Sequence, residues 1–283
     1  AFLLFLLAAV PTFLLAERVN TTINSGWLFH KGDVAIDAAE PDLEEWTRVN
    51  LPHTWNKEDA FDEEDGFYQG PGWYAKVLNV PAEWKNKRVF IHFEGANQET
   101  EVYLDGDLIG EHIGGYTAFR FDLSSHLKFG EPNLLTVRVT NEYNEDIPPL
   151  RMDFTFFGGI YRNVSLIVAD PVHFDLGNNA SDGVFTRINT VSYEKADISL
   201  FGKIVNTLNQ KRNVRLETTI TDHGQNVVVT DSREMRLSAG KTEDFESGNM
   251  VIRNPSLWSP DDPYLYTVIT RIYSTGSDEA LLD

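Results

Sequence analysis

Short runs of alternating apolar and polar residues, separated by Gly, Pro, Asn and Asp, recur along the chain after Trp27. Such runs stand at residues 73–80, 88–93, 101–104, 117–123 and 134–139. Because successive side chains of a strand point to opposite faces, this period of two predicts half-buried β-strands. No window of comparable length has sustained helical periodicity. The sequence therefore predicts an all-β fold of the sandwich or jelly-roll kind.

The dipeptide Asp170-Pro171 interrupts this series and predicts a domain boundary. The 283 residues are enough for about two domains of ~100–200 residues each. Beyond the boundary, residues 198–205, 214–220, 227–230 and 264–273 again have strand-like patterns. About a hundred residues with some seven short strands are typical of an immunoglobulin-like β-sandwich. We therefore expect a first domain over residues 17–170 and a second over residues 171–283.

The first sixteen residues, AFLLFLLAAVPTFLLA, form an apolar run that precedes Glu17 and Arg18. This run is long enough for the apolar part of a secretory signal and short for a spanning helix, which needs roughly 18 or more residues. We therefore expect residues 1–16 to be a signal-peptide-like segment and the protein to be exported, to the periplasm or the extracellular space. An uncleaved membrane tether is the alternative.

Composition excludes several classes of function. The chain has 43 acidic and 24 basic residues, a net charge of −19, which repels phosphate backbones and argues against nucleic acid or a membrane surface as partner of the folded part. It has no cysteine, so disulfides and Cys-based metal sites are excluded. The seven histidines lack metal-ligand spacing, and no nucleotide or serine-hydrolase motif occurs. The sequence predicts no metal and no cofactor.

Six short motifs rich in Gly, Pro and aromatic residues follow one another along the chain. They are residues 51–55 (LPHTW), 70–74 (GPGWY), 93–96 with 101–106 (FEGA, EVYLDG), 114–119 (GGYTAF), 153–168 (DFTFFGGIYRNVSLIV), and 257–260 with 263–266 (LWSP, PYLY). In this order, the motifs resemble those of glycoside hydrolase family 2, and the resemblance covers nearly everything after residue 20. Within the family, the motifs are more similar to those of the β-galactosidase branch.

The resemblance implies a jelly-roll (galactose-binding-like) sugar-binding domain followed by an immunoglobulin-like domain. It also implies a retaining glycosidase that cleaves a terminal β-linked sugar with two Glu residues of a C-terminal barrel, which this chain is expected to lack. The chain alone should then be inactive, with the missing barrel and a carbohydrate as its partners. Homo-oligomerisation of the intact protein stays open.

Asp153 is the candidate substrate-binding residue. A carboxylate accepts strong hydrogen bonds from sugar hydroxyls, and the Gly158-Gly159 pair that follows permits a sharp bend that fixes its loop. The alternative is a loop Asp that caps nearby backbone N–H groups. In the family, the Asp of this motif reaches the substrate pocket of the neighbouring barrel.

Several other residues of these motifs, or near them, could carry chemistry or could be structural. Glu142 follows Asn141, a pair that mimics the family's acid/base motif, but it follows a strand and lacks the Trp-Ser context, so we expect a structural role. Arg162 is expected to pair with a buried carboxylate. Trp73 is expected in the core, His53 to bond backbone, and the aromatics of residues 154–157 either to stack on a sugar or to pack against the barrel.

Two further functions compete with the glycosidase scaffold. A carbohydrate-binding module that acts alone would need an exposed aromatic platform. A structural or adhesive two-sandwich protein would lack any cleft of the size of a sugar. The glycosidase scaffold predicts instead an apolar, exposed face near Asp153.

Overall fold

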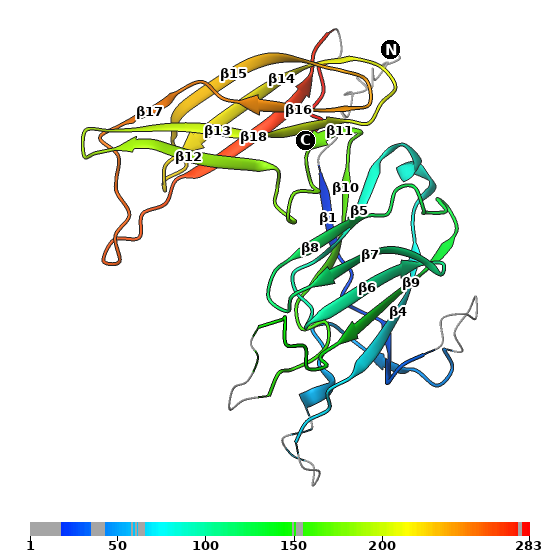
Figure 1. The fold of residues 1–283 in the computed structure, drawn as a ribbon. Coiled ribbons are helices and arrows are strands. Elements are labelled where there is room, and N and C mark those ends of the chain that lie inside the picture. The colour runs from blue at the N-terminus through cyan, green and yellow to red at the C-terminus, as the bar shows by residue number, and fades with distance from the viewer. Residues whose placement is uncertain are drawn as a thin grey trace, which may run out of the picture.

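The chain folds into two β-sandwiches joined end to end (Figure 1). The computed structural model describes residues 18–34, 43–57, 59, 61, 66–148, 150, 155–276 and 279–283. The predicted all-β fold of two consecutive sandwiches is confirmed. The signal-peptide-like segment, residues 1–16, lies outside the described residues. No helix in the described ranges is both long and apolar enough to cross a membrane.

The first sandwich packs a four-stranded sheet of order β1-β10-β5-β8 against a six-stranded sheet of order β3-β2-β4-β9-β6-β7. All strand pairs in both sheets are antiparallel. The strands are β1 (Val19–Thr22), β2 (Trp27–Lys31), β3 (Thr47–Val49), β4 (Pro71–Asn79), β5 (Arg88–Phe93), β6 (Glu99–Leu104), β7 (Asp107–Ile113), β8 (Phe119–Asp122), β9 (Pro132–Thr140) and β10 (Val164–Ala169). Two short 3₁₀ helices, η1 (Trp55–Lys57) and η2 (Ala82–Asn86), connect them.

Alternation places one face of each central strand in the core between these sheets. On β4, Tyr74 packs in the main core, whereas its neighbour Trp73 packs on the opposite face of the sheet against Trp46. Trp73 is therefore buried, as expected, but in a satellite cluster rather than inside the sandwich. A tight turn at Asp105 and Gly106 joins β6 to β7, and both residues have the positive φ that the turn needs.

The second sandwich contains the strands β11 to β18 of the described residues. One sheet has the order β11-β13-β12 with β16 and β17 also paired to β13, and the other has the order β15-β14-β18. The strands are β11 (Val172–Phe174), β12 (Val184–Val191), β13 (Lys195–Asn206), β14 (Arg212–Thr221), β15 (Val227–Leu237), β16 (Lys241–Glu246), β17 (Met250–Arg253) and β18 (Thr267–Ser274). The edge strands β12 and β15 are mostly exposed, so alternation does not mark their full length.

The residues that join the sandwiches are buried on both faces of β10. Leu166 faces the core of the first sandwich, whereas Ile167 and Ala169 pack with Leu176, which follows β11. All six residues of β10 are buried, so the two faces of this strand do not differ in exposure. The cause is that its outer face is covered by the second sandwich rather than by water.

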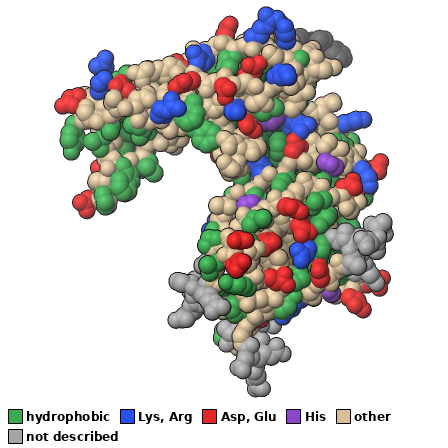
Figure 2. All heavy atoms as spheres, viewed as in Figure 1, with side chains coloured by type: hydrophobic (Ala, Val, Ile, Leu, Met, Phe, Trp, Pro, Cys, Tyr) green, Lys and Arg blue, Asp and Glu red, His purple; other side chains and the backbone are tan. Residues whose placement is uncertain are grey.

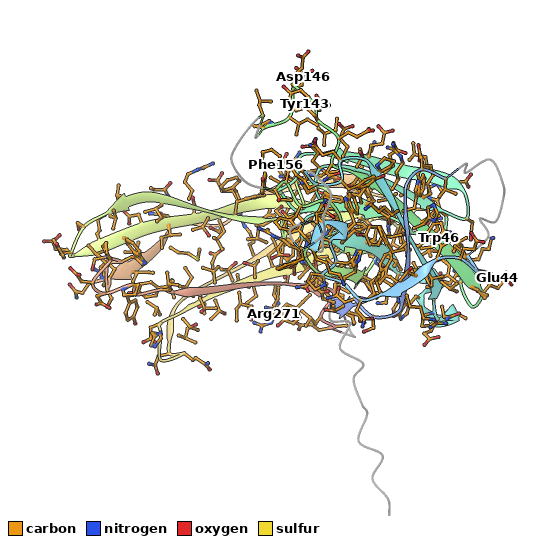
Figure 3. The ribbon with its side chains drawn as sticks, turned by 90° about the horizontal axis from the view of Figure 1, so that it is seen from below. Glu44, Trp46, Tyr143, Asp146, Phe156 and Arg271 are labelled. Atoms are coloured by element: carbon orange, nitrogen blue, oxygen red, sulfur yellow. The ribbon has the colours of Figure 1, made fainter. Side chains whose placement is uncertain are left out.

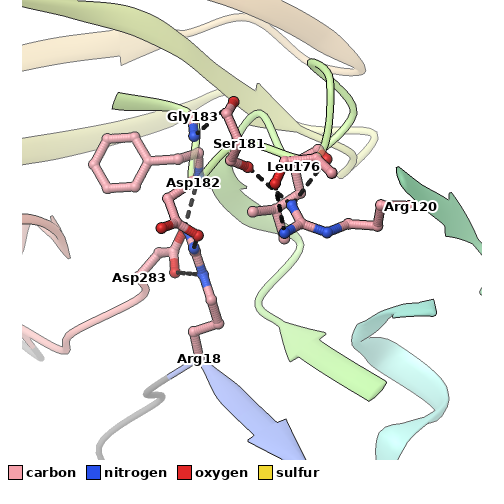
Figure 4. A network of polar contacts seen from close by, with 9 residues as sticks. Arg18, Arg120, Leu176, Ser181, Asp182, Gly183 and Asp283 are labelled. Carbon is pink, nitrogen blue, oxygen red and sulfur yellow. Dashed lines mark hydrogen bonds and ion pairs between the residues drawn. The ribbon is translucent and has the colours of Figure 1, made fainter. Parts of the chain in front are cut away.

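Two arginines complete this junction (Figure 4). Arg120 on β8 donates hydrogen bonds to the carbonyls of Leu176 (3.0 Å), Ser181 (2.9 Å) and Ala180 (3.1 Å). Arg18 forms a two-pronged ion pair with the side chain of Asp283, at 2.8 and 2.7 Å. Because carbonyls from one sandwich bind a cation from the other, the two sandwiches are joined by polar as well as apolar contacts.

Candidate functional site

The candidate site is the segment that follows Asp153. Asp153 itself lies outside the described residues, as does Phe154, so the structure begins this segment at Thr155. From Thr155 to Ile160 the chain has no regular secondary structure apart from an isolated bridge between Gly159 and Asn97. The position of this segment therefore depends on side-chain contacts and on tight packing.

Three asparagines hold the backbone of this segment. Asn141 donates to the carbonyl of Phe156 at 2.9 Å, and Asn97 donates to the carbonyl of Phe157 at 2.9 Å. The side-chain oxygen of Asn56 accepts the N–H of Gly158 at 2.7 Å. Asn56 lies in η1, Asn97 lies between β5 and β6, and Asn141 follows β9, so parts of the chain far apart in sequence fix three successive residues.

The asparagines are themselves fixed, because Asn56 and Asn141 are almost fully buried and bonded at both ends. The oxygen of Asn141 accepts the N–H of Gly70 at 3.0 Å, and its nitrogen also donates to the carbonyl of Tyr68 at 3.1 Å. Asn56 donates to the same carbonyl at 2.9 Å. A buried amide that satisfies both its donor and acceptor atoms has one favourable orientation, which gives the loop a rigid support.

The Gly158-Gly159 pair allows the close packing that the sequence predicts. A Cβ on Gly158 would lie 2.1 Å from Cζ2 of Trp55. Gly159 has φ +118°, and a Cβ there would lie 2.6 Å from the hydroxyl of Tyr74. Only glycine fits both positions without displacing Trp55 and Tyr74.

His53 and Tyr74 contact the segment at Ile160. The backbone N–H of His53 donates to the carbonyl of Ile160 at 2.8 Å, and its ring Nδ1 lies 2.9 Å from the Tyr74 hydroxyl. The prediction of a backbone bond thus holds for the main chain of His53, but its ring bonds a side chain. Burial, helped by the charge of Lys57, lowers the pKa of His53 to about 4, so the ring is neutral at physiological pH.

An apolar hollow of about 450 Å³ lies beside the segment. Its lining residues are Thr54, Asn97, Tyr116, Thr155, Phe156, Phe157 and Tyr161. Tyr116 is 54% exposed and Phe157 is 47% exposed. Figure 3 shows Phe156 on the same side of the first sandwich as Tyr143, another exposed aromatic, and away from Trp46. An apolar, exposed face therefore lies beside residues 155–157, while Asp153 itself lies outside the described residues.

Glu142 and Arg162 lie near the segment, and the sequence predicts a structural role for each of them. Glu142 is exposed, and its backbone carbonyl accepts a bond from Gln98, in agreement with a structural role for the Asn141-Glu142 pair. For Arg162, the described residues show no ion pair with a buried carboxylate: its side chain is exposed, donates to the carbonyl of Glu94 at 3.4 Å and lies over the ring of Tyr161.

No group of three or more His, Asp or Glu residues in the described ranges is arranged to hold a metal ion. Among the described residues, those that line the hollow carry hydroxyl, amide and aromatic groups, and none of these is a carboxylate. These groups can donate and accept hydrogen bonds and offer aromatic faces to a ligand. Acid/base chemistry at this hollow would need carboxyl groups from outside this lining.

Fold and site together define a two-sandwich protein that holds one loop rigidly beside an apolar hollow. The family described as "Glycosyl hydrolases family 2, sugar binding domain" matches residues 21–170, and "Glycosyl hydrolases family 2" matches residues 182–280. The chain belongs to glycoside hydrolase family 2, as its motifs indicate.

The relatives carry two kinds of name. A β-glucuronidase of Bacteroides fragilis is 35% identical over an aligned region that covers 97% of this chain and 38% of that protein. A β-galactosidase of Thermoanaerobacter pseudethanolicus is 35% identical over an aligned region that covers 88% of this chain and 32% of that protein. The crystal structure of a Bacteroides uniformis β-glucuronidase superimposes with a TM-score of 0.88 at 39% identity, covering 94% of this chain and 32% of that one. The chain thus spans about a third of the length of these relatives.

Proposed function

We propose that this chain supplies the sugar-binding and immunoglobulin-like domains of a longer retaining glycosidase that cleaves a terminal β-linked sugar. Membership of glycoside hydrolase family 2 and relatives named β-glucuronidase and β-galactosidase support this proposal. In it, the chain contributes binding and positioning. The two carboxyl groups that a retaining mechanism needs about 5 Å apart belong to a catalytic barrel.

The observation that carries the proposal is the support of the backbone at residues 156–158. Three side chains from three separate elements each bind one of these residues, although the segment has no strand or helix of its own. Such support fixes the position of the side chains that the loop carries. It is typical of a loop that must hold a functional group in place, because preorganisation lowers the entropic cost of binding.

In this proposal Asp153, two residues before Thr155, accepts hydrogen bonds from hydroxyl groups of the sugar. The exposed aromatics Tyr116 and Phe157 then contact either the sugar or the barrel. A charged acceptor forms a stronger bond to a hydroxyl than a neutral one does. Asp153→Asn should therefore weaken substrate binding less than Asp153→Ala does.

The test uses the complete gene product and aryl β-galactoside and β-glucuronide substrates. We expect Asp153→Ala to lower kcat/KM about 10- to 100-fold, as the loss of a hydrogen bond to a charged group implies. Asp261→Ala, which removes an exposed carboxylate of the second sandwich, is the matched control and should have no effect. An Asp153→Ala variant with unchanged kcat/KM would refute the role of this residue.

A second candidate function is a carbohydrate-binding module that acts without a barrel. The exposed pair Tyr116 and Phe157 beside the hollow favours it, because stacking on sugar rings needs accessible aromatic faces. Calorimetric titration of the chain with neutral oligosaccharides separates the two proposals. Micromolar binding by the chain alone supports the module, whereas binding only by the complete gene product supports the scaffold.

We also propose that residues 1–16 direct export to the periplasm or the extracellular space, on the apolar pattern of that segment. Fractionation of the host cells tests this proposal. We expect the protein in the exported fraction with residues 1–16 removed from its N-terminus. Retention of the complete segment in a cytoplasmic fraction would contradict export.

A further inference from the structure

The second sandwich is open along one side, between the strands β12 and β18. Strand β12 pairs with β13 alone, and β18 pairs with β14 and, near its end, with Leu281, so both are edge strands over most of their length in the described chain. On the other side of the sandwich, β15 of one sheet packs against β16 and β17 of the other, whereas β12 and β18 make no comparable contact. The side of β12 and β18 is therefore the open one.

Apolar side chains of β12 that point towards the core are exposed at this opening. Ile188 pairs with Ile198 on β13, and Val191 pairs with Ala196. Cross-strand partners share one face of a sheet, and Ile198 packs with Leu200 in the core of the sandwich. Ile188 is nevertheless 63% exposed and Val191 59% exposed. Strand alternation thus turns both side chains inward, but the opposite sheet leaves them uncovered.

The loop between β17 and β18, residues 254–266, borders the same end of the sandwich. It begins beside the turn that follows β12, because the N–H of Asn254 donates to the carbonyl of Glu194 at 2.9 Å. It is also held at its other end, where the N–H of Ser256 donates to the hydroxyl of Tyr266 at 2.9 Å and the Tyr266 ring packs against the core. The loop is therefore anchored to the sandwich at both ends.

This anchored loop exposes further large apolar side chains. Trp258 is 60% exposed and Leu265 is 67% exposed, and Tyr193 in the neighbouring turn is exposed as well. Figure 1 shows the loop projecting from the free end of the second sandwich, and Figure 2 shows hydrophobic side chains gathered over this region, on the side of the notch between the two sandwiches. Apolar surface that stays exposed marks contact with another protein surface.

The chemistry of this surface suits protein better than sugar. The side chains of Ile188, Val191 and Leu265 have no hydrogen-bonding group, whereas the hydroxyl groups of a sugar need partners when they leave water. Covering aliphatic side chains with other apolar groups, in contrast, is favourable without any such partner.

We propose that this open side, formed by Ile188, Val191 and the loop with Trp258 and Leu265, is the docking surface for the catalytic part of the longer protein. This inference rests on the proposed function. The chain spans about a third of the length of its relatives, so the longer protein of that proposal has ample further polypeptide to cover the open side. A body seated in the notch contacts this surface and also adjoins the first sandwich, as that proposal requires (Figure 2).

Cysteine labelling tests the docking, because the 283-residue chain has no cysteine of its own. Leu265→Cys introduces a thiol on the proposed surface, and Leu108→Cys introduces one at an exposed apolar position of β7 in the first sandwich. Both thiols should react readily with a maleimide in the 283-residue chain. In the complete gene product, the thiol of Leu265→Cys should react at least about tenfold more slowly, because a docked surface is reached only through local opening, and that of Leu108→Cys should react as before. Peptide mass spectrometry assigns the label to each position.

The outcomes separate this inference from the proposed function. Protection of Leu265→Cys in a complete product that does not hydrolyse aryl β-glycosides would keep the docking surface and refute the proposed activity. Hydrolysis with an unprotected Leu265→Cys would keep the activity and overturn the docking surface. Protection that develops in the 283-residue chain alone as its concentration rises would identify a second copy as the occupant and would also overturn the proposal.

Thermal unfolding provides a second measurement. Leu265→Ser should lower the melting temperature of the complete product by a few degrees, because it removes apolar contact with the docked part. It should leave the melting temperature of the 283-residue chain unchanged, since substitutions of exposed residues have little effect on stability. Leu108→Ser is the matched control and should change neither form. Equal losses for Leu265→Ser in both forms would assign this residue to the folding of the second sandwich and would contradict docking.

Discussion

At the scale of single residues, the site depends on amides rather than on charges. Asn56, Asn97 and Asn141 each use one polar atom to fix the backbone of residues 156–158. An amide does this without the desolvation cost that a buried charge would carry.

His53 gives a prediction at the same scale. Burial and then the charge of Lys57 lower the pKa of His53 from 6.5 to about 4. Between these two values the unfolded chain binds a proton that the folded chain does not bind. The contribution of this group to stability is therefore complete above pH 6.5 and is lost as the pH falls towards 4.

Nuclear magnetic resonance checks the pKa directly. The ring resonances of His53 should keep their neutral positions from pH 8 to pH 5, and His53→Gln should flatten the acid side of the stability profile measured by urea unfolding. A titration midpoint of His53 near 6.5 would contradict the buried, neutral ring.

At the scale of elements, the segment Thr155–Ile160 behaves as one packed unit. Its glycines let Trp55 and Tyr74 approach its backbone, and no strand competes for its hydrogen-bonding groups. Gly158→Ala should cost about 1–3 kcal/mol, because the new methyl group collides with Trp55. The N–H of Gly158, bonded to Asn56 in the native protein, marks whether the segment stays in place.

Hydrogen exchange and urea unfolding measure this effect. The amide at position 158 should exchange slowly in the native protein and quickly in Gly158→Ala. Gly177→Ala is the control, because its Cβ would meet only a side-chain oxygen at 3.3 Å, and it should change stability by less than about 0.5 kcal/mol. Rapid exchange of Gly158 in the native chain would mean that the loop is not held.

Much of this element was predictable from the sequence. The Gly-Gly pair, the LPHTW motif and the GPGWY motif supply the glycines, Trp55, His53 and Tyr74, and strands such as Glu99–Leu104 follow their alternation. The three asparagines gave no signal of this role, because their partners lie 15, 60 and 102 residues away in the chain. A single sequence does not reveal such pairings. Strand β12 was also missed, since an exposed edge strand has no buried face to impose alternation.

At the scale of the whole molecule, Arg120 joins the sandwiches through three carbonyls of the residues after β11. Figure 2 shows a notch between the two parts beside this junction. Arg120→Ala should lower stability by about 3 kcal/mol, because hydrogen bonds to a charged group are lost and carbonyls lose their donor. It should also widen the range of angles between the sandwiches.

Small-angle X-ray scattering tests the change of shape, and urea unfolding tests the loss of stability. The radius of gyration should rise in Arg120→Ala and stay constant in Arg233→Ala, an exposed arginine on β15. Identical scattering by Arg120→Ala and the native chain would show that the apolar packing around Ile167 and Leu176, together with the Arg18–Asp283 ion pair, sets the angle without Arg120.

The central claim is that this part of a family 2 protein binds and positions a sugar but does not cleave it. The most direct measurement is hydrolysis of aryl β-galactoside and β-glucuronide by the purified 283-residue chain, side by side with the complete gene product. We expect no turnover by the chain and clear turnover by the complete product, because a retaining mechanism needs a carboxyl pair that the described lining of the hollow does not supply. Robust hydrolysis by the chain alone would contradict the account.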